Sequence, residues 1–263
     1  MPPDRTLTSR YEWKYFVPPR ILPSIRSMIR PFMRPDSFAR RWPEYRYPLV
    51  SLYLDGESLE LYRTTVEGHR NRFKLRVRAY DDDPASPVFL EIKKRSNVVV
   101  RKSRACVSRE DAMKLIRGRL PHLEQSAAQE FAVRLREIKA QPVVRVRYQR
   151  EAYESQQGDP VRLTIDTDIE HAVTRSADIG LEDGEWRSTP TEGAIVELKF
   201  SDRCPEWATR LIDQLEISRE SIPKYVLSMD DALAGGRFQS ANALMGPNSF
   251  PSQRLPVAGW RRA

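Results

Sequence analysis

The sequence has few of the residues that most often form a nucleophile or a metal centre. Its two cysteines, Cys106 and Cys204, lack metal-ligand spacing, and we expect them to be reduced thiols. Its three histidines, His69, His122 and His171, have no partners at a useful spacing, and we expect them on the surface. An enzyme built on a histidine or cysteine nucleophile is therefore not indicated.

Long apolar runs are also missing. No run approaches the roughly 20 residues that span a bilayer. The first ten residues, MPPDRTLTSR, lack the apolar core of a signal peptide, and no internal repeat is evident. These absences predict a soluble, cytoplasmic protein.

Charge is abundant. Lysine and arginine total 44 and aspartate and glutamate 36, so the formal net charge is +8 over 263 residues. A basic chain favours polyanionic partners such as nucleic acid, anionic lipid or a phosphate compound. The length suffices for one large domain or two small ones with a sizeable core.

Strand-like runs dominate the chain and predict an α+β fold with about eight strands. The runs lie at residues 11–17, 48–55, 72–80, 89–95, 98–107, 142–154, 161–169 and 194–200. Helices are predicted at 22–33, 108–120 (with Ser108 as N-cap) and 126–139, and a final one at 205–216. Short connections between the strands indicate an antiparallel sheet.

The C-terminal end has a different composition. From Gly235 onward the chain is rich in Gly, Pro, Ser and Asn and shows little periodicity. We therefore predict a folded domain at residues 1–234 and a flexible tail at 235–263.

Charged side chains alternate with apolar ones along most of the predicted strands. One face carries Glu12, Lys14, Lys74, Arg76, Arg78, Glu91, Lys93, Arg95, Lys102, Arg104, Arg162, Thr164, Asp166, Asp168, Glu197 and Lys199. The simplest interpretation is the wet face of an antiparallel sheet. Closing the sheet into a β-barrel of about eight strands would instead turn this face inward around one ligand, with helices packed outside.

The residue types favour the enclosed arrangement. These positions are mainly Arg, Lys, Glu and Asp, and the planar arginine group suits bidentate binding of phosphate. A mostly cationic interior with a few carboxylates suits a polyphosphate with a bound metal, because carboxylates hold Mg²⁺ or Mn²⁺. We do not expect nucleic acid as a partner, since its basic residues should lie on an exposed face with stacking aromatics.

Seven blocks of the chain carry a family resemblance. They are RYEWKYFVP, VSLYLDGESLELYRTTVEGHRNRFKLRVRAY, FLEIKKRSNVVVRKSRA, VRYQREAYE, VRLTIDTDI, AIVELKF and KYVLSM, and they span roughly residues 9 to 230. Their order and spacing resemble those of the VTC domain, a family of triphosphate tunnel metalloenzymes related to the CYTH phosphatases. The resemblance implies a tunnel of antiparallel strands, ATP-dependent polyphosphate synthesis, and Mn²⁺ or Mg²⁺ as cofactor.

The same resemblance implies roles for individual positions. Arg76 and Arg78 resemble the phosphate-binding arginine pair, and Glu197 resembles the metal-binding glutamate. The other implied catalytic residues are Lys93, Lys102, Arg150 and Lys224, the substrate-binding residues are Lys14, Lys74, Arg104, Tyr148 and Lys199, and the further metal candidates are Glu12 and Glu91. CYTH relatives open with Glu-x-Glu-x-Lys, and Arg10 stands at the first of these positions, which fits the VTC branch better.

Some assignments stay open. Alternation places Arg145 and Arg147 opposite Val144 and Val146, whereas the family match puts Tyr148 and Arg150 in the tunnel, and a bulge could reconcile the two. Glu91 could hold a metal or pair with Lys93. Asp166 and Asp168 could assist the metal or orient arginines, while Asp55 and Tyr53 are expected to stabilise a strand end and turn.

The predicted function is that of a polyphosphate polymerase-like phosphotransferase acting on ATP, triphosphate and polyphosphate. The terminal phosphate of a growing chain is already ionised, so the reaction needs positioning and charge more than a general base. The alternatives are an inorganic triphosphatase or nucleotide phosphohydrolase, with Glu12 or Glu91 orienting water, and a non-catalytic polyphosphate-binding module. A membrane protein that feeds or exports the chain is a candidate partner.

Overall fold

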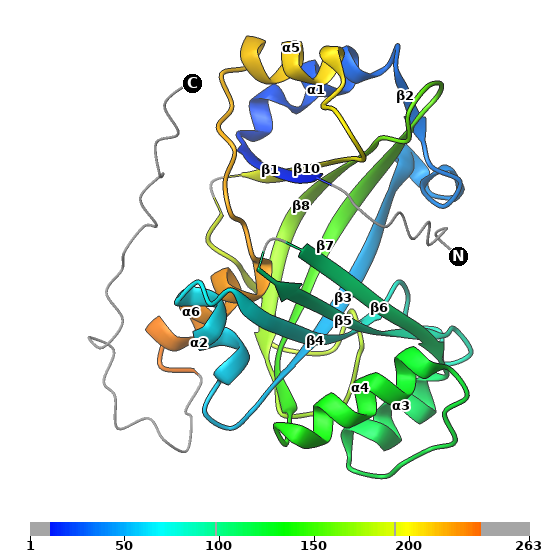
Figure 1. Cartoon of the computed structure of the whole chain (residues 1–263), viewed down its shortest axis with the longest axis vertical. Helices are drawn as coiled ribbons and strands as arrows, with labels where there is room; N and C mark the ends of the chain where they lie inside the picture. The colour runs from blue at the N-terminus through cyan, green and yellow to red at the C-terminus, as the bar shows by residue number, and fades with distance from the viewer. Residues whose placement is uncertain (1–10, 98, 192, 238–263) are drawn as a thin grey trace.

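One long antiparallel sheet forms the body of the molecule (Figure 1). The computed structural model describes residues 11–97, 99–191 and 193–237. The hydrogen-bonded order is β1-β10-β8-β7-β3-β4-β5-β6, with β2 added to β7 and β9 to β8. The strands are β1 (Tyr11–Val17), β2 (Met33–Pro35), β3 (Arg46–Asp55), β4 (Asn71–Ala79), β5 (Val88–Ser96), β6 (Val99–Val107), β7 (Gln141–Ser155), β8 (Arg162–Val173), β9 (Arg187–Ser188) and β10 (Ala194–Phe200).

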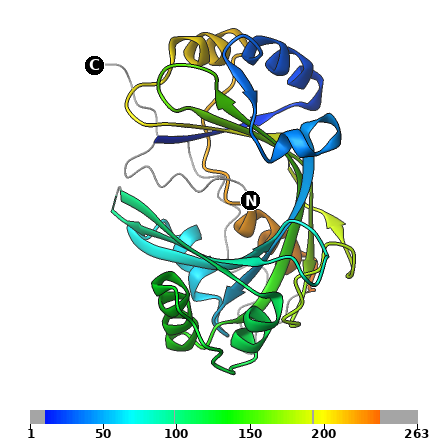
Figure 2. The same cartoon turned by 90° about the vertical axis from the view of Figure 1, so that its right-hand side faces the viewer.

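The sheet curls so that its two halves face each other (Figure 2). Neighbouring strands pair antiparallel, which confirms the predicted α+β class. The curl is looser than a closed barrel, because β1 and β6 do not pair in the part of the chain that the structure describes. We call the gap between β1 and β6 the seam. Across it, Lys93 Nζ of β5 lies 3.0 Å from Glu12 Oε1 of β1.

Helices cover the outer face of the sheet, as predicted. They are α1 (Leu22–Ile29), α2 (Glu60–Val66), α3 (Arg109–Ile116), α4 (Ser126–Glu137), α5 (Glu206–Gln214) and α6 (Lys224–Ala234), with 3-10 turns at Pro19–Ile21, Ala39–Arg41 and Pro43–Tyr45. On one half, Leu75, Leu90 and Ile92 pack beneath Phe131 and Leu135 of α4. On the other half, Val196 and Leu198 share a core with Ile25 of α1 and Leu211 of α5. Alternation therefore separates an apolar outside from the inner face.

Helix α6 is the exception, because it packs on the inner face. The Tyr225 ring stacks on Tyr53 with centroids 4.8 Å apart, and Met229 shares a cluster with Val144 and Val146. The helix predicted at residues 205–216 is confirmed as α5, but it is not the final one, because α6 follows it. Tyr225, Met229 and Ala232 recur at helical spacing and are buried together, which makes residues 224–234 a helix in this setting.

Aromatic side chains fill the opposite end of the inner face. Phe38 contacts Tyr47 and Tyr80 with ring centroids 4.7 and 5.3 Å apart, and Tyr80 contacts Phe89 at 5.7 Å. The buried Asp36 carboxylate fixes the segment that carries Phe38, because it accepts the backbone N–H groups of Phe38 and Ala39. Tyr47 lies near the start of β3 and Tyr53 near its end, so this aromatic cluster and α6 occupy opposite ends.

The pairing of β7 with β8 shows which arginines of β7 lie on the inner face of the sheet. Arg147 pairs with Glu170 and Gln149 with Thr167, so one residue of β7 faces two of β8, and Asp168 there has a φ of 52°. The bulge therefore lies on β8, and β7 keeps its regular alternation against β3 from Arg147 onward. Tyr148 and Arg150 point inward, as the family match implied, and Arg145 and Arg147 point outward.

Two segments need separate mention. Helix α2 lies within a stretch whose polar character gave no helix prediction, and Leu61 and Tyr62 are its buried residues. Of the predicted tail, residues 238–263 lie outside the described residues, and the domain boundary stays a prediction. Among the helices described here, none has the length and apolar character needed to span a membrane.

Candidate functional site

The inner face carries one connected group of charged side chains between α6 and the aromatic cluster. We call it the ionic cluster. Its carboxylates are Glu12, Glu91, Asp166 and Glu197, and its cations are Lys14, Lys74, Arg76, Arg78, Lys93, Lys102, Arg104, Arg150, Lys199 and Lys224. All the site residues predicted from the sequence lie in it or, like Tyr148, against it. Their roles stay predictions.

Residues of β4, β5 and β6 form rows across the strands. In one row Arg76, Glu91 and Arg104 are register partners, with Arg76 Nε 2.6 Å from Glu91 Oε2. Lys102 Nζ lies 2.9 Å from the other Glu91 oxygen. Burial alone would raise the pKa of Glu91, but Arg76, Arg78 and the neighbouring cations lower it well below its usual value. Glu91 is thus an ionised anchor for the surrounding cations.

The neighbouring row consists of lysines alone. Lys74, Lys93 and Lys102 are register partners on the three strands. Burial, together with Lys93 and Lys14, lowers the pKa of Lys74 to about 7. Burial also lowers the pKa of Lys102 to about 8, although Glu91 opposes this shift. Like charges opposite one another destabilise a sheet, so this row is best satisfied by an anion.

Arg78 of β4 and Arg150 of β7 form what we call the floor of the cluster, and hydroxyl groups and one aspartate hold them. Arg78 donates to Ser51 Oγ and to the Tyr148 hydroxyl, each at 3.2 Å. Arg150 binds Asp166 through two nitrogens, at 2.6 and 2.8 Å, and Lys224 Nζ lies 2.6 Å from the same carboxylate. Burial would raise the pKa of Asp166, but Arg150 and Lys224 lower it to about 2. Of its two candidate roles, Asp166 is placed to orient Arg150.

Two carboxylates converge near the seam. Lys14 Nζ lies 2.9 Å from Glu12 Oε1 and 3.3 Å from Glu197 Oε2, and Lys199 also pairs with Glu197. Burial and the neighbouring Glu197 would raise the pKa of Glu12, but Lys93 and Lys14 lower it to about 2. The pKa of Glu197 is also lowered well below its usual value, against burial, by Lys199 and Lys14. Both groups are ionised at neutral pH.

The fit of a metal can be judged from these groups. Within residues 11–97, 99–191 and 193–237, no group of three or more His, Cys, Asp or Glu side chains is placed to hold a metal ion. Mg²⁺ sites, however, commonly use one or two carboxylates and leave the remaining positions to water and substrate phosphates. Glu12 and Glu197 fit that pattern. All three carboxylates are paired with cations, but Glu91 fits the pattern less well because its side chain is only 1% exposed, whereas those of Glu12 and Glu197 are 26% and 10% exposed.

Three charged residues predicted for this face lie outside the cluster. Arg95 is exposed near the β5–β6 turn and donates to the Asn97 carbonyl at 2.8 Å. Arg162 pairs with Asp36 at 2.7 Å, and Asp168 sits in the β8 bulge paired with Arg46 at 2.8 Å. The bulge redirects Asp168, and Arg95 lies beside the β5–β6 turn. Arg162 keeps the alternating phase of β8, but it lies at the start of the strand, where its partner is Asp36.

Other sequence expectations gave mixed results. His171 is buried rather than on the surface, with Nδ1 3.0 Å from Thr189 Oγ1, because α6 packs over this part of β8. His69 and His122 are exposed, as expected. Asp55 does stabilise the end of β3, since it accepts the N–H groups of Gly56, Leu61 and Tyr62.

Tyr53 is a site residue that the sequence did not indicate. Its hydroxyl accepts from Arg76 Nη1 at 3.3 Å, so it lies in the floor of the ionic cluster in addition to stacking on α6. Ser51, which binds Arg78, was missed in the same way. Both lie two residues apart on the inner face of β3, and continuing the alternation through uncharged polar residues would have found them.

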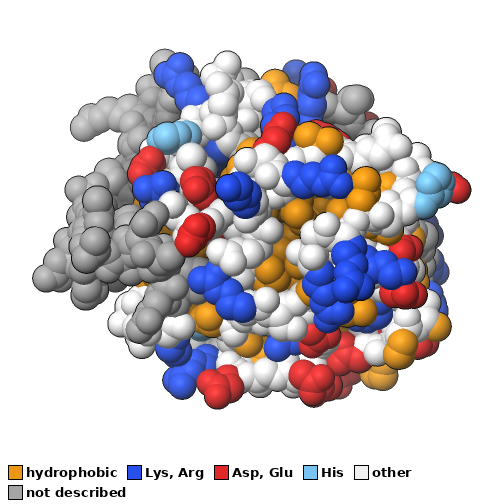
Figure 3. Space-filling view, turned by 90° about the horizontal axis from the view of Figure 1, so that it is seen from below, with side chains coloured by type: hydrophobic (Ala, Val, Ile, Leu, Met, Phe, Trp, Pro, Cys, Tyr) orange, Lys and Arg blue, Asp and Glu red, His pale blue; other side chains and the backbone are white. Residues whose placement is uncertain are grey.

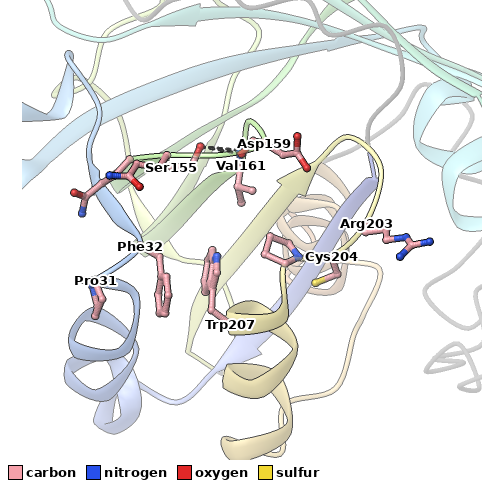
Figure 4. A pocket seen from close by; sticks show the side chains of 11 residues that line it. Pro31, Phe32, Ser155, Asp159, Val161, Arg203, Cys204 and Trp207 are labelled. Carbon is pink, nitrogen blue, oxygen red and sulfur yellow. Dashed lines mark hydrogen bonds between the residues drawn. The ribbon is translucent and has the colours of Figure 1, made fainter.

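The outside of the protein differs from the ionic cluster. A pocket of about 410 Å³ lies near the ends of α1 and α5, beside the stacked rings of Phe32 and Trp207 (Figure 4). Arg203 is its only basic lining residue in the described chain, and Asp159 also lines it. On the face seen from below, basic and acidic side chains lie close together (Figure 3). Neither region has the enclosed positive charge of the interior.

Comparisons with known proteins agree with the family resemblance. The family model described as the VTC domain matches residues 9–232. A relative from Trypanosoma brucei brucei, vacuolar transporter chaperone complex subunit 4, is 27% identical over 224 residues, which cover 68% of this chain. The chain spans only 27% of the length of that relative.

Solved structures with a similar arrangement are more distant. A candidate adenylate cyclase from Bacillus halodurans has a TM-score of 0.48 at 13% identity, covering 82% of this chain and 94% of that one. The PH1819 protein from Pyrococcus horikoshii OT3 has a TM-score of 0.45 at 14% identity, covering 84% and 99%. A candidate adenylyl cyclase from Hippeastrum, described as having a dominant triphosphatase activity, has a TM-score of 0.47 at 13% identity, covering 88% and 96%.

Proposed function

The chain belongs to the VTC domain family, and we propose that it is a polyphosphate polymerase-like phosphotransferase that binds ATP, triphosphate and polyphosphate in the ionic cluster. The observation that carries this proposal is the charge of the inner face, where ten cationic side chains accompany four carboxylates. Enclosed cations in such excess repel one another. A polyphosphate supplies a row of negative charges that removes this repulsion.

The chain's own residues position and neutralise the phosphates. Arg76, Arg78 and Arg150 project planar guanidinium groups that can bind phosphate oxygens in a bidentate way. The lysine row adds three point charges along the same path. Phosphoryl transfer to an ionised phosphate nucleophile needs alignment and charge neutralisation rather than a strong base. The described part of the cluster, which contains no histidine or cysteine, is suited to this chemistry.

A divalent metal is the proposed cofactor, and Mn²⁺ and Mg²⁺ are both compatible with oxygen ligands. When bound, it would neutralise charge on the phosphoryl group. Glu12 and Glu197 would hold it, because both are ionised and they approach the same point near Lys14. We assign Glu91 to the anchoring of Arg76 and Lys102 instead.

Hydrolysis is the second candidate function. Glu12 is ionised and its side chain is 26% exposed at the seam, so it could orient a water toward a bound triphosphate. The difference between polymerase and hydrolase then lies in whether phosphate or water reaches the reacting group. Both activities use the same cations.

One experiment separates these functions. The purified full chain would be incubated with ATP and Mn²⁺, with polyphosphate analysed on a gel and ADP and orthophosphate measured in solution. A polyphosphate ladder with ADP release supports the polymerase, and orthophosphate without a ladder supports the hydrolase. If neither forms but triphosphate raises the melting temperature, the protein is a binding module. No stabilisation by triphosphate would contradict all three.

Partners and location stay proposals. The relative is named as a subunit of a complex, and we propose that this chain also acts with a protein partner. That this partner is a membrane protein, and that the chain is cytoplasmic, are predictions from the sequence. Co-purification of the tagged chain, with and without detergent extraction, tests whether the partner is a membrane protein.

A further inference from the structure

Lys74 differs from the other cations of the ionic cluster in its partners. Each of the others lies within hydrogen-bond or ion-pair distance of an oxygen. These oxygens belong to Glu12, Ser51, Glu91, Tyr148, Asp166 and Glu197. Lys74 has no hydrogen-bond or ion-pair partner among the residues that the structure describes, and its Nζ lies 5.9 Å from the centre of the Tyr225 ring of α6.

The charged groups that act most strongly on Lys74 are all cations. Lys93 is its register partner on β5, and Lys14 acts on it from β1. Arg72 and Arg76 stand two residues before and after it on β4. Burial and these four cations lower the pKa of Lys74 to about 7. At pH 8 most of this amine therefore carries a free electron pair.

An unprotonated amine in such surroundings is suited to react with CO₂. The Nζ electron pair adds to the carbon of CO₂ and forms a C–N bond, while the electron pair of one C=O π bond moves to oxygen. One proton of the nitrogen is then lost to water, and the product is an anionic carbamate. The Lys74 side chain is partly exposed, so a molecule as small as CO₂ can reach it.

The carbamate would relieve the imbalance of charge around Lys74. It replaces a group that has no oxygen partner in the described residues by an anion, and Lys93, Lys14 and Arg76 are its neighbouring cations. Charge-assisted hydrogen bonds from these cations stabilise the product, and they have no counterpart when an exposed lysine reacts. The cation excess of the ionic cluster thus favours the reaction.

We propose that Lys74 is a site of reversible carbamate formation with CO₂. The modification takes the position on the lysine row at which, in the proposed function, phosphate oxygens bind. CO₂ and triphosphate then exclude each other, which makes the phosphate site sensitive to dissolved CO₂. The modification itself does not depend on the proposed function, whereas this exclusion rests on it.

Chemical trapping detects the carbamate directly. The purified full chain would be equilibrated at pH 8 with ¹³C-bicarbonate, which supplies CO₂, and treated with triethyloxonium tetrafluoroborate, which converts a carbamate into a stable ethyl ester. Tryptic digestion and mass spectrometry then locate the label. Only unprotonated amines react, so the yield at Lys74 should exceed that at the exposed Lys94 and Lys139 by about tenfold or more. No label at Lys74, or equal yields at the three lysines, would overturn the inference.

Two adjacent lysines of β5 test the argument from the neighbouring cations. Lys93 is the register partner of Lys74, whereas Lys94 is that of Phe73. Lys93→Met removes a cation that opposes protonation of Lys74 and pairs with the carbamate, so the yield at Lys74 should fall by about threefold or more. Lys94→Met is the matched control and should leave the yield unchanged. An undiminished yield in Lys93→Met, or an equal fall in both variants, would contradict the proposal.

Triphosphate separates this inference from the proposed function. Added at saturation, it should lower the yield at Lys74 by about fivefold or more, because phosphate oxygens favour the protonated amine and cover it. A yield that triphosphate does not change would support the modification site and contradict triphosphate binding at the lysine row. Absence of the label from the free protein, with triphosphate still raising the melting temperature, would overturn the inference and leave the proposed function standing.

Discussion

Two strands of this protein carry the same tripeptide, Arg-Val-Arg, and use it differently. On β4, Arg76 and Arg78 face the ionic cluster. On β7, Arg145 and Arg147 face outward over Trp186, with guanidinium carbons 5.2 and 4.3 Å from the ring centre. The arginines themselves are similarly accessible, since Arg76 is 23% exposed and Arg147 24%.

The partners of these arginines distinguish the two regions. Each outer arginine binds one carboxylate, Glu170 or Asp178, and also a backbone carbonyl. Arg147 donates to the Leu181 carbonyl at 2.6 Å, and Arg145 to the Gly180 carbonyl at 3.1 Å. The inner arginines bind side chains, namely Glu91, Tyr53, Ser51 and Tyr148. The two backbone carbonyls, which have no counterpart among the partners of the inner pair in the described residues, tie the outer pair to residues 180–181. The inner pair is therefore suited to binding and the outer pair to holding a loop on the sheet.

The largest effect should come from a glutamate of the inner face. Glu197→Gln keeps the shape of the side chain but removes the charge that would hold a metal. Metal-dependent turnover of ATP should fall by about a hundredfold or more, since a metal supplies several kcal/mol of charge stabilisation. Metal-free binding of triphosphate should persist or tighten, because one negative charge is gone. ADP release and calorimetry, each with and without Mn²⁺, measure both effects.

Glu170 provides the matched outer control for that variant. It pairs with Arg147 at 2.8 Å and is 34% exposed. Glu170→Gln should leave turnover at the wild-type level. Full turnover in Glu197→Gln would mean that the carboxylate is structural, and the metal ligand would then be sought at Glu12.

A smaller but clear effect is expected from the inner arginines. Arg78→Ala removes a cation whose hydrogen-bond partners, Ser51 and Tyr148, are neutral, so no buried charge is left alone. Loss of a charged hydrogen bond should weaken triphosphate binding by about 1.5 to 3 kcal/mol, or roughly 10- to 150-fold. Arg145→Ala, measured by the same calorimetry, should bind triphosphate like the wild type. Equal losses in the two variants would contradict the division between inner and outer pairs.

Much of the division between inner and outer side chains could be predicted from the sequence, because side chains alternate between the two faces along a strand. The strand around Glu91 and Lys93 has the predicted phase, and Ser108 caps α3 by accepting the Asp111 N–H at 3.0 Å, as its position indicated. The inward placement of Tyr148 and Arg150 came from the family match, since alternation alone could not say which face of β7 lies inside.

The remaining features depend on contacts between distant residues. Helix α6 is set by burial of Tyr225 and Met229 against strands far away in the chain, and the six residues at 224–229 do not reveal it. His171 is buried because the same helix covers it. The bulge at Asp168 shifts one strand relative to its neighbour, and a residue other than glycine at positive φ gives no clear sequence signal.

The outer arginine pair should matter for stability instead of binding. Arg147→Ala removes the bond to the Leu181 carbonyl and the contact with Trp186. Together these should lower the free energy of unfolding by about 1 to 2 kcal/mol, with little added by the partly exposed ion pair to Glu170. Urea denaturation measures the loss, and triphosphate affinity should not change. An unaltered unfolding midpoint would show that the loop is held by other contacts.

The smallest expected effect is the uptake of protons by the lysine row when triphosphate binds. The outer arginine pair has no such row beside it. Burial, with Lys93 and Lys14, lowers the pKa of Lys74 to about 7, so at pH 8 most of its amine is neutral in the free protein. A bound phosphate favours the ammonium form and raises this pKa, so binding takes up protons and weakens as the pH rises above 7. The unfolded chain, with the ordinary lysine pKa of 10.5, binds more protons between pH 7 and 10.5, so the contribution of Lys74 to stability rises with pH there.

Calorimetry of triphosphate binding at pH 8, in two buffers with different ionisation enthalpies, measures this uptake directly. Lys74→Arg keeps a permanent charge at the same position, so it should bind triphosphate with less proton uptake than the wild type. Part of the uptake should remain, because the pKa of Lys102 is also lowered, to about 8. Arg147→Ala should take up as many protons as the wild type, since that side chain does not touch the lysine row. Undiminished uptake in Lys74→Arg would place the titrating group elsewhere on the inner face.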